Sequence, residues 1–219
     1  MDPVIYQNLV DICAVSMLLL SVMAIASSRM TRLSQIFSIH SLLLAILAFI
    51  VAVYTGNNHI FIICALTFIL KVVTIPKFLN YMMDKINMEK EVEPLVGIPG
   101  SLLLSTTLVL IAYLITEPML DALSTMGRNC LAISLSIVFI GLLMMITRRK
   151  ALTESIGLLL MENGLFLGAI TISYGMPLIV EFGVFFDIII AVVIIGIFAY
   201  RINRTFNSID TSFMRRLKE

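Results

Sequence analysis

The sequence has few residues that could hold a metal or a redox cofactor. Its 219 residues include 3 cysteines and 2 histidines. Cys13, Cys64 and Cys130 lie far apart, inside or at the edge of apolar runs, and form no CxxC pair. Such a chain cannot by itself hold an iron–sulfur cluster, a nickel site or a structural zinc. We therefore expect no cofactor, metal or catalytic centre in this chain, so that any redox chemistry belongs to a partner.

Charged residues are also scarce, at 13% of the chain, whereas 60% of the residues are hydrophobic. An ordinary soluble domain is only about 45–50% apolar. The net charge of +1 and the lack of a basic tract give no reason to expect nucleic-acid binding. The apolar residues come in blocks of about 20, which as helices cross about 30 Å of hydrocarbon. The sequence therefore predicts an all-α, multi-pass transmembrane bundle in the lipid bilayer of the cell (inner or plasma) membrane.

Hydropathy predicts about seven spans, at 4–27, 33–54, 59–82, 98–116, 128–147, 152–174 and 178–200. The N-terminal segment has no positively charged region, so we expect it to be the first transmembrane helix rather than a cleaved signal. Of the 15 lysines and arginines, 13 lie in or beside the connectors after the first, third, fifth and seventh spans. The positive-inside rule then places the N-terminus outside and the C-terminus in the cytoplasm.

This order of spans divides the chain into three parts. Residues 1–97 form an N-terminal three-helix membrane unit with a cytoplasmic connector, 98–127 a linking helix with an outer loop, and 128–219 a second three-helix unit with a cytoplasmic tail. An offset of 116 residues maps Arg32 onto Arg148 and Lys71 onto Asp187. These matching positions indicate either a parallel duplication of a three-helix unit or a coincidence of spacing.

Four ionisable residues of the predicted spans need an explanation, His40, Lys71, Glu162 and Asp187, whereas Glu154 and Glu181 lie nearer the span ends and are expected to be solvated. A charge inside a bilayer is costly and marks a functional site or a buried pair. At about 1.5 Å per residue, Glu162 lies about 18 Å and Asp187 about 21 Å from the basic turns, hence at similar depth. We interpret the four residues as a proton relay. Lys71 could instead be a structural counter-ion of either acid, and His40 a packing hydrogen bonder.

Small polar residues accompany Glu162 along its predicted helix. Ser155 and Ser173 fall on or close to its face, and Asn163 lies beside it. A stripe of this kind either leaves room for the water that proton transfer needs or marks a tightly packed interface. We expect Ser155, Asn163 and Ser173 to support the relay.

A proline follows Lys71 by five residues. Pro76 has no backbone N–H and cannot donate to the carbonyl of Val72, which frees an acceptor inside the membrane. We expect the helix to bend one turn after Lys71.

The C-terminal half resembles a known family. "ITRRKALTESIGLLLMENGLFLGAI", followed by "FFDIIIAVVIIGIFAYRINRTFNSID", is similar over about 128–210 to the K-type subunit of respiratory complex I and the C subunit of Mrp antiporters. The whole chain, with "KVVTIP" and "LMENG", resembles the hydrogenase-4 component E family. There are two departures. With the arginine turns aligned, the complex I acid falls at Leu159, one turn before Glu162, and Asp187 stands where that family has a glutamate.

The resemblance implies a non-redox membrane-arm subunit of a group 4 [NiFe]-hydrogenase or formate hydrogenlyase-like complex. Such a subunit would relay protons, or couple charge changes, between the redox module and the antiporter-like subunits. Its partners would be antiporter-like membrane subunits, an H-type membrane subunit and hydrogenase-like peripheral subunits. Those partners would hold the nickel–iron centre and the iron–sulfur clusters, so whether the chain is part of an enzyme depends on them. Glu162 and Asp187 would exchange protons through water, Lys71 would set their protonation, and His40 would supply the cytoplasmic side.

Three alternatives remain open at this stage. A subunit of an Mrp-type cation/proton antiporter without a redox partner would carry the same acids, and the transported ion could be H⁺ or Na⁺. A structural assembly subunit would use Lys71 only for packing. A seven-helix photoreceptor would need a lysine in the last span, where this chain has none and instead has Asp187.

Overall fold

A computed structural model describes residues 3–56, 58–85, 96–118, 125–148 and 151–173. All of these lie in the first of two compact units, which covers residues 1–184. The described residues form helices and contain no β-strand. The helices are α1 (Pro3–Ala26), α2 (Met30–Thr55), α3 (Asn58–Thr67), the π-helix η1 (Phe68–Thr74), α4 (Ile75–Lys85), α5 (Ile98–Thr116), α6 (Thr125–Thr147) and α7 (Ala151–Ser173).

The predicted all-helical membrane fold is confirmed for this part of the chain. Four helices are long and apolar enough to cross a bilayer: α1, α2, α5 and residues 129–147 of α6. Apolar side chains also cover the outward surface, as shown by Val4 and Leu103 at 70% exposure and Leu19 at 61%. Exposed apolar surface on this scale is stable against lipid and not against water. The protein is an integral membrane protein. The predicted span 178–200 lies outside the described residues.

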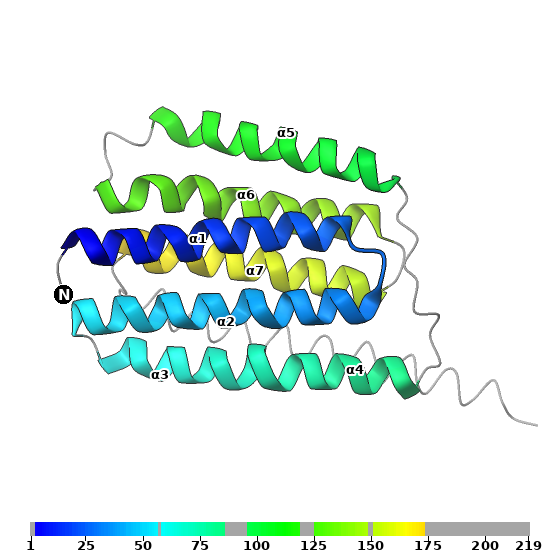
Figure 1. Ribbon diagram of the computed structural model, residues 1–219, viewed down its shortest axis with the longest axis horizontal. Coiled ribbons are helices and arrows are strands. Elements are labelled where there is room, and N and C mark those ends of the chain that lie inside the picture. The colour runs from blue at the N-terminus through cyan, green and yellow to red at the C-terminus, as the bar shows by residue number, and fades with distance from the viewer. Residues whose placement is uncertain (1–2, 57, 86–95, 119–124, 149–150, 174–219) are drawn as a thin grey trace, which may run out of the picture. The chain divides into compact units, whose positions relative to one another are not determined.

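The described helices lie side by side with their axes in similar directions (Figure 1). The α1–α2 hairpin packs against the α6–α7 hairpin, with α1 against α6 and α2 against α7. Helix α5 lies beside α6 and α1, whereas α3 and α4 lie beside α2. The predicted N-terminal and C-terminal units therefore contact each other directly through these helices. This contact brings side chains that are far apart in the sequence to one place.

Helix α2 ends at Gly56, which has φ of 66° and donates its N–H to the carbonyl of Ala52 at 2.9 Å. Glycine adopts this left-handed conformation without the steric cost that a β-carbon imposes. The chain can therefore reverse at once into α3. This tight reversal places η1 beside the middle of α2.

Glycines set the distance between α6 and α7. A β-carbon on Gly141 would lie 2.7 Å from the backbone nitrogen of Met161 and 2.8 Å from the carbonyl oxygen of Gly157. On α7, a β-carbon on Gly164 would lie 3.0 Å from the carbonyl oxygen of Ser134. Gly164 thus permits close packing of α7 against α6. Because Gly157 and Gly164 of α7 face α6, side chains on the other face of α7 are directed at α2 and η1.

Arg148 closes one end of the bundle. Its side chain, 2% exposed, donates from Nη2 to the carbonyls of Ile25 at 2.6 Å and Ser27 at 3.1 Å. These carbonyls lie at the C-terminal end of α1, where helices lack intrahelical donors and where the helix dipole favours a cation. Burial lowers the pKa of the guanidinium from its ordinary value, but arginine keeps its proton in proteins. The turns after α1 and α6, both predicted to be cytoplasmic, thus lie at the same end.

Candidate functional site: a buried polar network between α2, η1 and α7

Lys71 lies in the interior of the bundle, in the middle of the π-helix. It is 1% exposed, and its Nζ contacts two consecutive side chains of α7. Nζ donates to Asn163 Oδ1 at 3.0 Å and forms an ion pair with Glu162 Oε2 at 3.4 Å. The ring of Phe166, one helical turn further along α7, has its centroid 5.7 Å from Nζ and adds a cation–π contact. The hypothesis that Lys71 is a partner of Glu162 therefore has a geometric basis.

The π-helix carries Lys71 at a point where proline interrupts the hydrogen-bond ladder. In η1 the backbone bonds span five residues, and at its end the N–H of Ile75 donates to Leu70 O. The Val72 carbonyl, which Pro76 cannot reach with an N–H, accepts a hydrogen bond from Ser38 Oγ on α2 at 3.2 Å. Thr74 Oγ1 donates to the carbonyl of Ile69 at 2.8 Å. Two hydroxyl groups thus compensate the distorted ladder, and the π-helix passes into α4 at Ile75, one residue before Pro76.

Asn163 connects Lys71 to α2. Its side-chain amide is fully buried, and Nδ2 lies 3.2 Å from His40 Nδ1 and 3.1 Å from Ser41 Oγ. On the other side of the imidazole, His40 Nε2 lies 3.1 Å from Ser21 Oγ on α1, which also donates to the carbonyl of Met17 at 3.0 Å. One polar chain therefore runs from Glu162 on α7 to Ser21 on α1.

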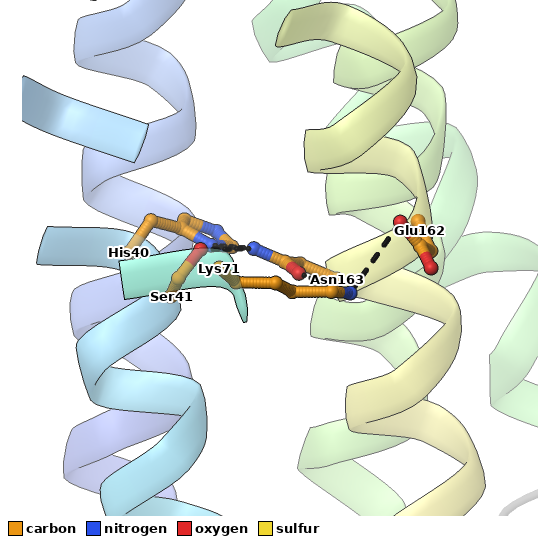
Figure 2. A network of polar contacts seen from close by, with 5 residues as sticks. All are labelled: His40, Ser41, Lys71, Glu162 and Asn163. Atoms are coloured by element: carbon orange, nitrogen blue, oxygen red, sulfur yellow. Dashed lines mark hydrogen bonds and ion pairs between the residues drawn. The ribbon is translucent and has the colours of Figure 1, made fainter. Parts of the chain in front are cut away.

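Figure 2 shows that this chain runs across the helices and not along them. His40 and Ser41 project from α2, Asn163 and Glu162 project from α7, and the Lys71 side chain extends between them. Glu162 is 5% exposed, and the other four side chains are at most 1% exposed. A charged group buried so deeply is expensive unless it is paired. The network supplies that pairing with a base, an acid, an ammonium and an amide at one level of the bundle.

Three of the four residues predicted for the relay, His40, Lys71 and Glu162, meet in this network. Asn163, which we expected to support the relay from beside the stripe, bridges two of them. Ser155 is buried on α7, about two helical turns before Glu162. The side chain of Ser173 and all of Asp187 lie outside the described residues, so the predicted Glu162–Asp187 relay stays a prediction.

Sequence reasoning missed Ser21 and Ser41. A signal for Ser21 does exist, because it continues the buried face of α1 that includes Tyr6, Val10 and Met17. Ser41 directly follows His40, although consecutive residues on a helix point about 100° apart. Only the packing of α2 against both α7 and η1 shows that both side chains reach the same amide.

In the described part of the chain, no group of three or more His, Cys, Asp or Glu residues could hold a metal ion. What the network can do chemically is exchange and redistribute protons, since His, Lys and Glu each have two protonation states.

The C-terminal part of the chain carries a recognisable family signature. Residues 129–219 match the sequence model of the family described as NADH-ubiquinone/plastoquinone oxidoreductase chain 4L. That segment contains Glu162 and Asn163, whereas His40, Lys71 and Ser21 lie before it. The network therefore joins the part that is similar to chain 4L with the part that precedes it.

Individual relatives extend the similarity to most of the chain. Hydrogenase-4 component E of Escherichia coli K12 is 27% identical over 203 residues, which are 92% of this chain and 94% of that protein. The component E of Shigella flexneri matches at the same identity and coverage. The Mycobacterium tuberculosis protein "Uncharacterized protein Rv0085" is 34% identical over 131 residues, and the match spans 60% of each protein. No solved structure matches the chain. The chain is thus a homologue of hydrogenase-4 component E with a chain 4L-like C-terminal half.

Proposed function

We propose that this chain is a proton-relaying, non-redox subunit in the membrane arm of a complex I-like assembly of the hydrogenase-4 or formate hydrogenlyase type. The observation that carries the proposal is the buried network of Glu162, Lys71, Asn163 and His40. Similarity to component E along 92% of the chain and to chain 4L at its C-terminal part supports the choice of assembly. A purely structural subunit would not need three titratable side chains linked at one level.

In the proposed arrangement, seven helices cross the membrane with the N-terminus outside and the C-terminus in the cytoplasm. The meeting of the turns after α1 and α6 at Arg148 supports this alternation, because both turns are predicted to be cytoplasmic. The partners would be antiporter-like and H-type membrane subunits with hydrogenase-like peripheral subunits. The nickel–iron centre and the iron–sulfur clusters would reside in those partners.

The relay has two proton-exchanging ends within the described residues. At one end, the ammonium of Lys71 and the carboxylate of Glu162 are close enough to exchange a proton through a small movement of either side chain. We propose that Glu162 passes this proton on to Asp187 through water, along the face that carries Ser155 and Ser173. At the other end, His40 exchanges protons with the cytoplasmic side.

The first test is to identify the partners. A tagged chain is purified in a mild detergent, and the proteins that accompany it are identified by mass spectrometry. Hydrogenase large and small subunits together with antiporter-like subunits are the expected result. Mrp-type subunits without a redox protein would replace this proposal with the cation/proton antiporter. A chain that stays alone in a detergent that preserves such complexes contradicts both.

The second test replaces Glu162 with Gln in the assembled complex. Proton translocation into inverted membrane vesicles should fall to background, whereas redox activity with an artificial dye should stay at the native level. Glu154→Gln, in the first turn of the same helix and outside the network, is the matched control and should translocate normally. Measuring Na⁺ uptake in the same vesicles distinguishes the two ions. Full translocation by a correctly assembled Glu162→Gln complex would remove Glu162 from the mechanism.

A further inference from the structure

The centre of the network is an amide that cannot itself carry a proton. Asparagine has an acceptor oxygen and a donor NH₂ group, and neither changes protonation near neutral pH. Protons therefore cannot pass between Lys71 and His40 by binding to Asn163. The bridge between these two cationic side chains must act through the orientation of the amide.

Lys71 fixes that orientation. An ammonium group only donates hydrogen bonds, so the amide atom 3.0 Å from Nζ must be the oxygen Oδ1. The NH₂ group consequently points at α2, where Nδ2 lies 3.1 Å from Ser41 Oγ and 3.2 Å from His40 Nδ1. As long as Lys71 is charged, His40 and Ser41 on α2 therefore face the NH₂ donor of Asn163.

The orientation of the amide in turn fixes the proton on His40. A nitrogen that faces an NH₂ donor must be an acceptor, so Nδ1 carries no proton and the imidazole is neutral. Its proton is on Nε2 and is donated to Ser21 Oγ at 3.1 Å, and the Ser21 hydroxyl donates onward to the carbonyl of Met17 at 3.0 Å. From Asn163 through His40 and Ser21 to the carbonyl of Met17, each donor then faces an acceptor.

Adding a second proton to His40 disrupts this arrangement. A proton on Nδ1 would place two donors, Nδ1–H and Nδ2–H, against each other at 3.2 Å in a fully buried site. Rotating the amide by 180° relieves the clash at His40 but turns the NH₂ group toward Lys71. That orientation is satisfied only if Lys71 has become a neutral amine whose lone pair accepts.

We infer that the Asn163 amide is a two-position coupler that makes the cationic forms of His40 and Lys71 mutually exclusive. The inference rests on the proposed function, which makes proton binding at these residues part of turnover. When His40 gains a proton at Nδ1, the amide reverses and Lys71 gives up one proton to Glu162, the carboxylate 3.4 Å away. The charge on His40 plus Lys71 stays at one, and Glu162 becomes neutral. Among the described residues, Lys71 and Glu162 are the charged members of the network around His40 and Asn163.

The protonation state of His40 can be observed directly. Nitrogen-15 NMR of labelled histidine distinguishes the Nε2–H form, the Nδ1–H form and the imidazolium. The full-length chain is studied in lipid bilayers with the subunits that accompany it, and the His40 signal is the one that disappears in His40→Gln. We expect the neutral Nε2–H form in the native protein at neutral pH. A neutral Nδ1–H form or an imidazolium there would overturn the inference.

A double-mutant cycle separates coupling through the amide from simple repulsion between two charges. Lys71→Met/Glu162→Gln removes one charge of each sign, and Asn163→Leu removes the amide at similar volume. With Asn163 present, the charge-removing pair should raise the imidazolium fraction of His40 at about pH 6 by about tenfold or more. In the Asn163→Leu background, the same pair should raise it by less than about threefold. Equal increases in both backgrounds would show that the charges interact through space and would overturn the coupling role.

One further variant tests the coupling if Asn163→Leu does not fold. Asn163→Asp/Glu162→Gln keeps one carboxylate in the network but places an acceptor toward both His40 and Lys71. Both cations should then be present together, with His40 seen as imidazolium at neutral pH. A neutral His40 in this variant contradicts the inference. These NMR results are independent of translocation, so coupling can fail while Glu162→Gln still blocks transport, and the reverse outcome is equally visible.

Discussion

Two buried cations in this protein, Lys71 and Arg148, have similar exposure and opposite surroundings. Arg148 lies at the end of the bundle and donates to two backbone carbonyls, which have one protonation state. Lys71 lies in the interior and contacts a carboxylate and an amide that are linked to an imidazole. Backbone carbonyls cannot change protonation, so the surroundings of Arg148 suit a permanent charge, whereas a carboxylate and an imidazole each have two protonation states. The two cations are equally buried, so the chemistry of their partners, and not burial, separates them.

Exchanging the two side-chain types tests this difference most strongly. Lys71→Arg should assemble normally but reduce proton translocation to background, because a guanidinium does not release its proton. Arg148→Lys should assemble and translocate at close to the native rate, because only the positive charge and its donors are needed there. Proton uptake by inverted vesicles, normalised to assembled complex, measures both. Native translocation by Lys71→Arg would mean that Lys71 is a fixed counter-ion like Arg148.

Removing the charge at Arg148 should produce the next largest effect, and on stability. Arg148→Met loses two hydrogen bonds from a charged donor, each worth about 1.5–3 kcal/mol. We expect roughly 3 kcal/mol or more of lost stability, seen as a lower midpoint of thermal unfolding in detergent. The control Arg32→Met removes an exposed arginine from the start of α2 and should leave the midpoint nearly unchanged. An unchanged midpoint for Arg148→Met would show that the link between α1 and α6 does not stabilise the bundle.

A smaller effect should follow from separating α6, which ends next to Arg148, from α7, which carries the partners of Lys71. Gly141→Ala places a methyl group 2.7 Å from the Met161 backbone nitrogen, so α6 and α7 must move apart. Overpacking of this kind costs about 1–3 kcal/mol. In Gly100→Ala the nearest atom is Cγ1 of the exposed Val96 side chain at 2.6 Å, which has room to move away because no backbone atom blocks it, so this control should be neutral or slightly stabilising. Equal unfolding midpoints for the two variants would contradict the close backbone contact.

The smallest expected effect concerns the support of the π-helix. Ser38→Ala removes the hydroxyl that donates to the Val72 carbonyl at 3.2 Å, at a cost of about 1 kcal/mol. Ser16→Ala is the matched control, because Ser16 donates only to Ile12 within its own helix. The unfolding midpoint of Ser38→Ala should fall below that of Ser16→Ala. If it does not, the Val72 carbonyl does not depend on Ser38.

Much of the helical layout could be predicted from the sequence, because apolar blocks of membrane length determine it. The predicted span 98–116 coincides with α5, and 33–54 lies within α2. The freed carbonyl of Val72 was also predictable, since it follows from the chemistry of Pro76. The π-helix around Lys71 was not predictable, because the freed carbonyl is satisfied by the hydroxyl of Ser38 on another helix.

The candidate site was predictable in its residues and not in its connections. Charge inside an apolar run identified His40, Lys71 and Glu162 without any knowledge of packing. The bridging role of Asn163 was hidden, because a single sequence does not say which helix faces which. For the same reason, Arg148 was expected in a basic cytoplasmic turn and its contacts with the end of α1 were not foreseen. Long-range partners of polar groups require the packing of the helices.

The crosswise direction of the network has a consequence for its energetics in an energised membrane. A charge that crosses the whole bilayer does work against the membrane voltage of about 2.3 kcal/mol per 100 mV. Lys71, Asn163 and His40 lie at one level across the helix axes (Figure 2), so charge shifting among them moves nearly at right angles to the electric field. Redistribution within the network should therefore proceed at the same rate in energised and de-energised vesicles. The electrical work of transport would fall on the steps that bring protons to this level and carry them away from it.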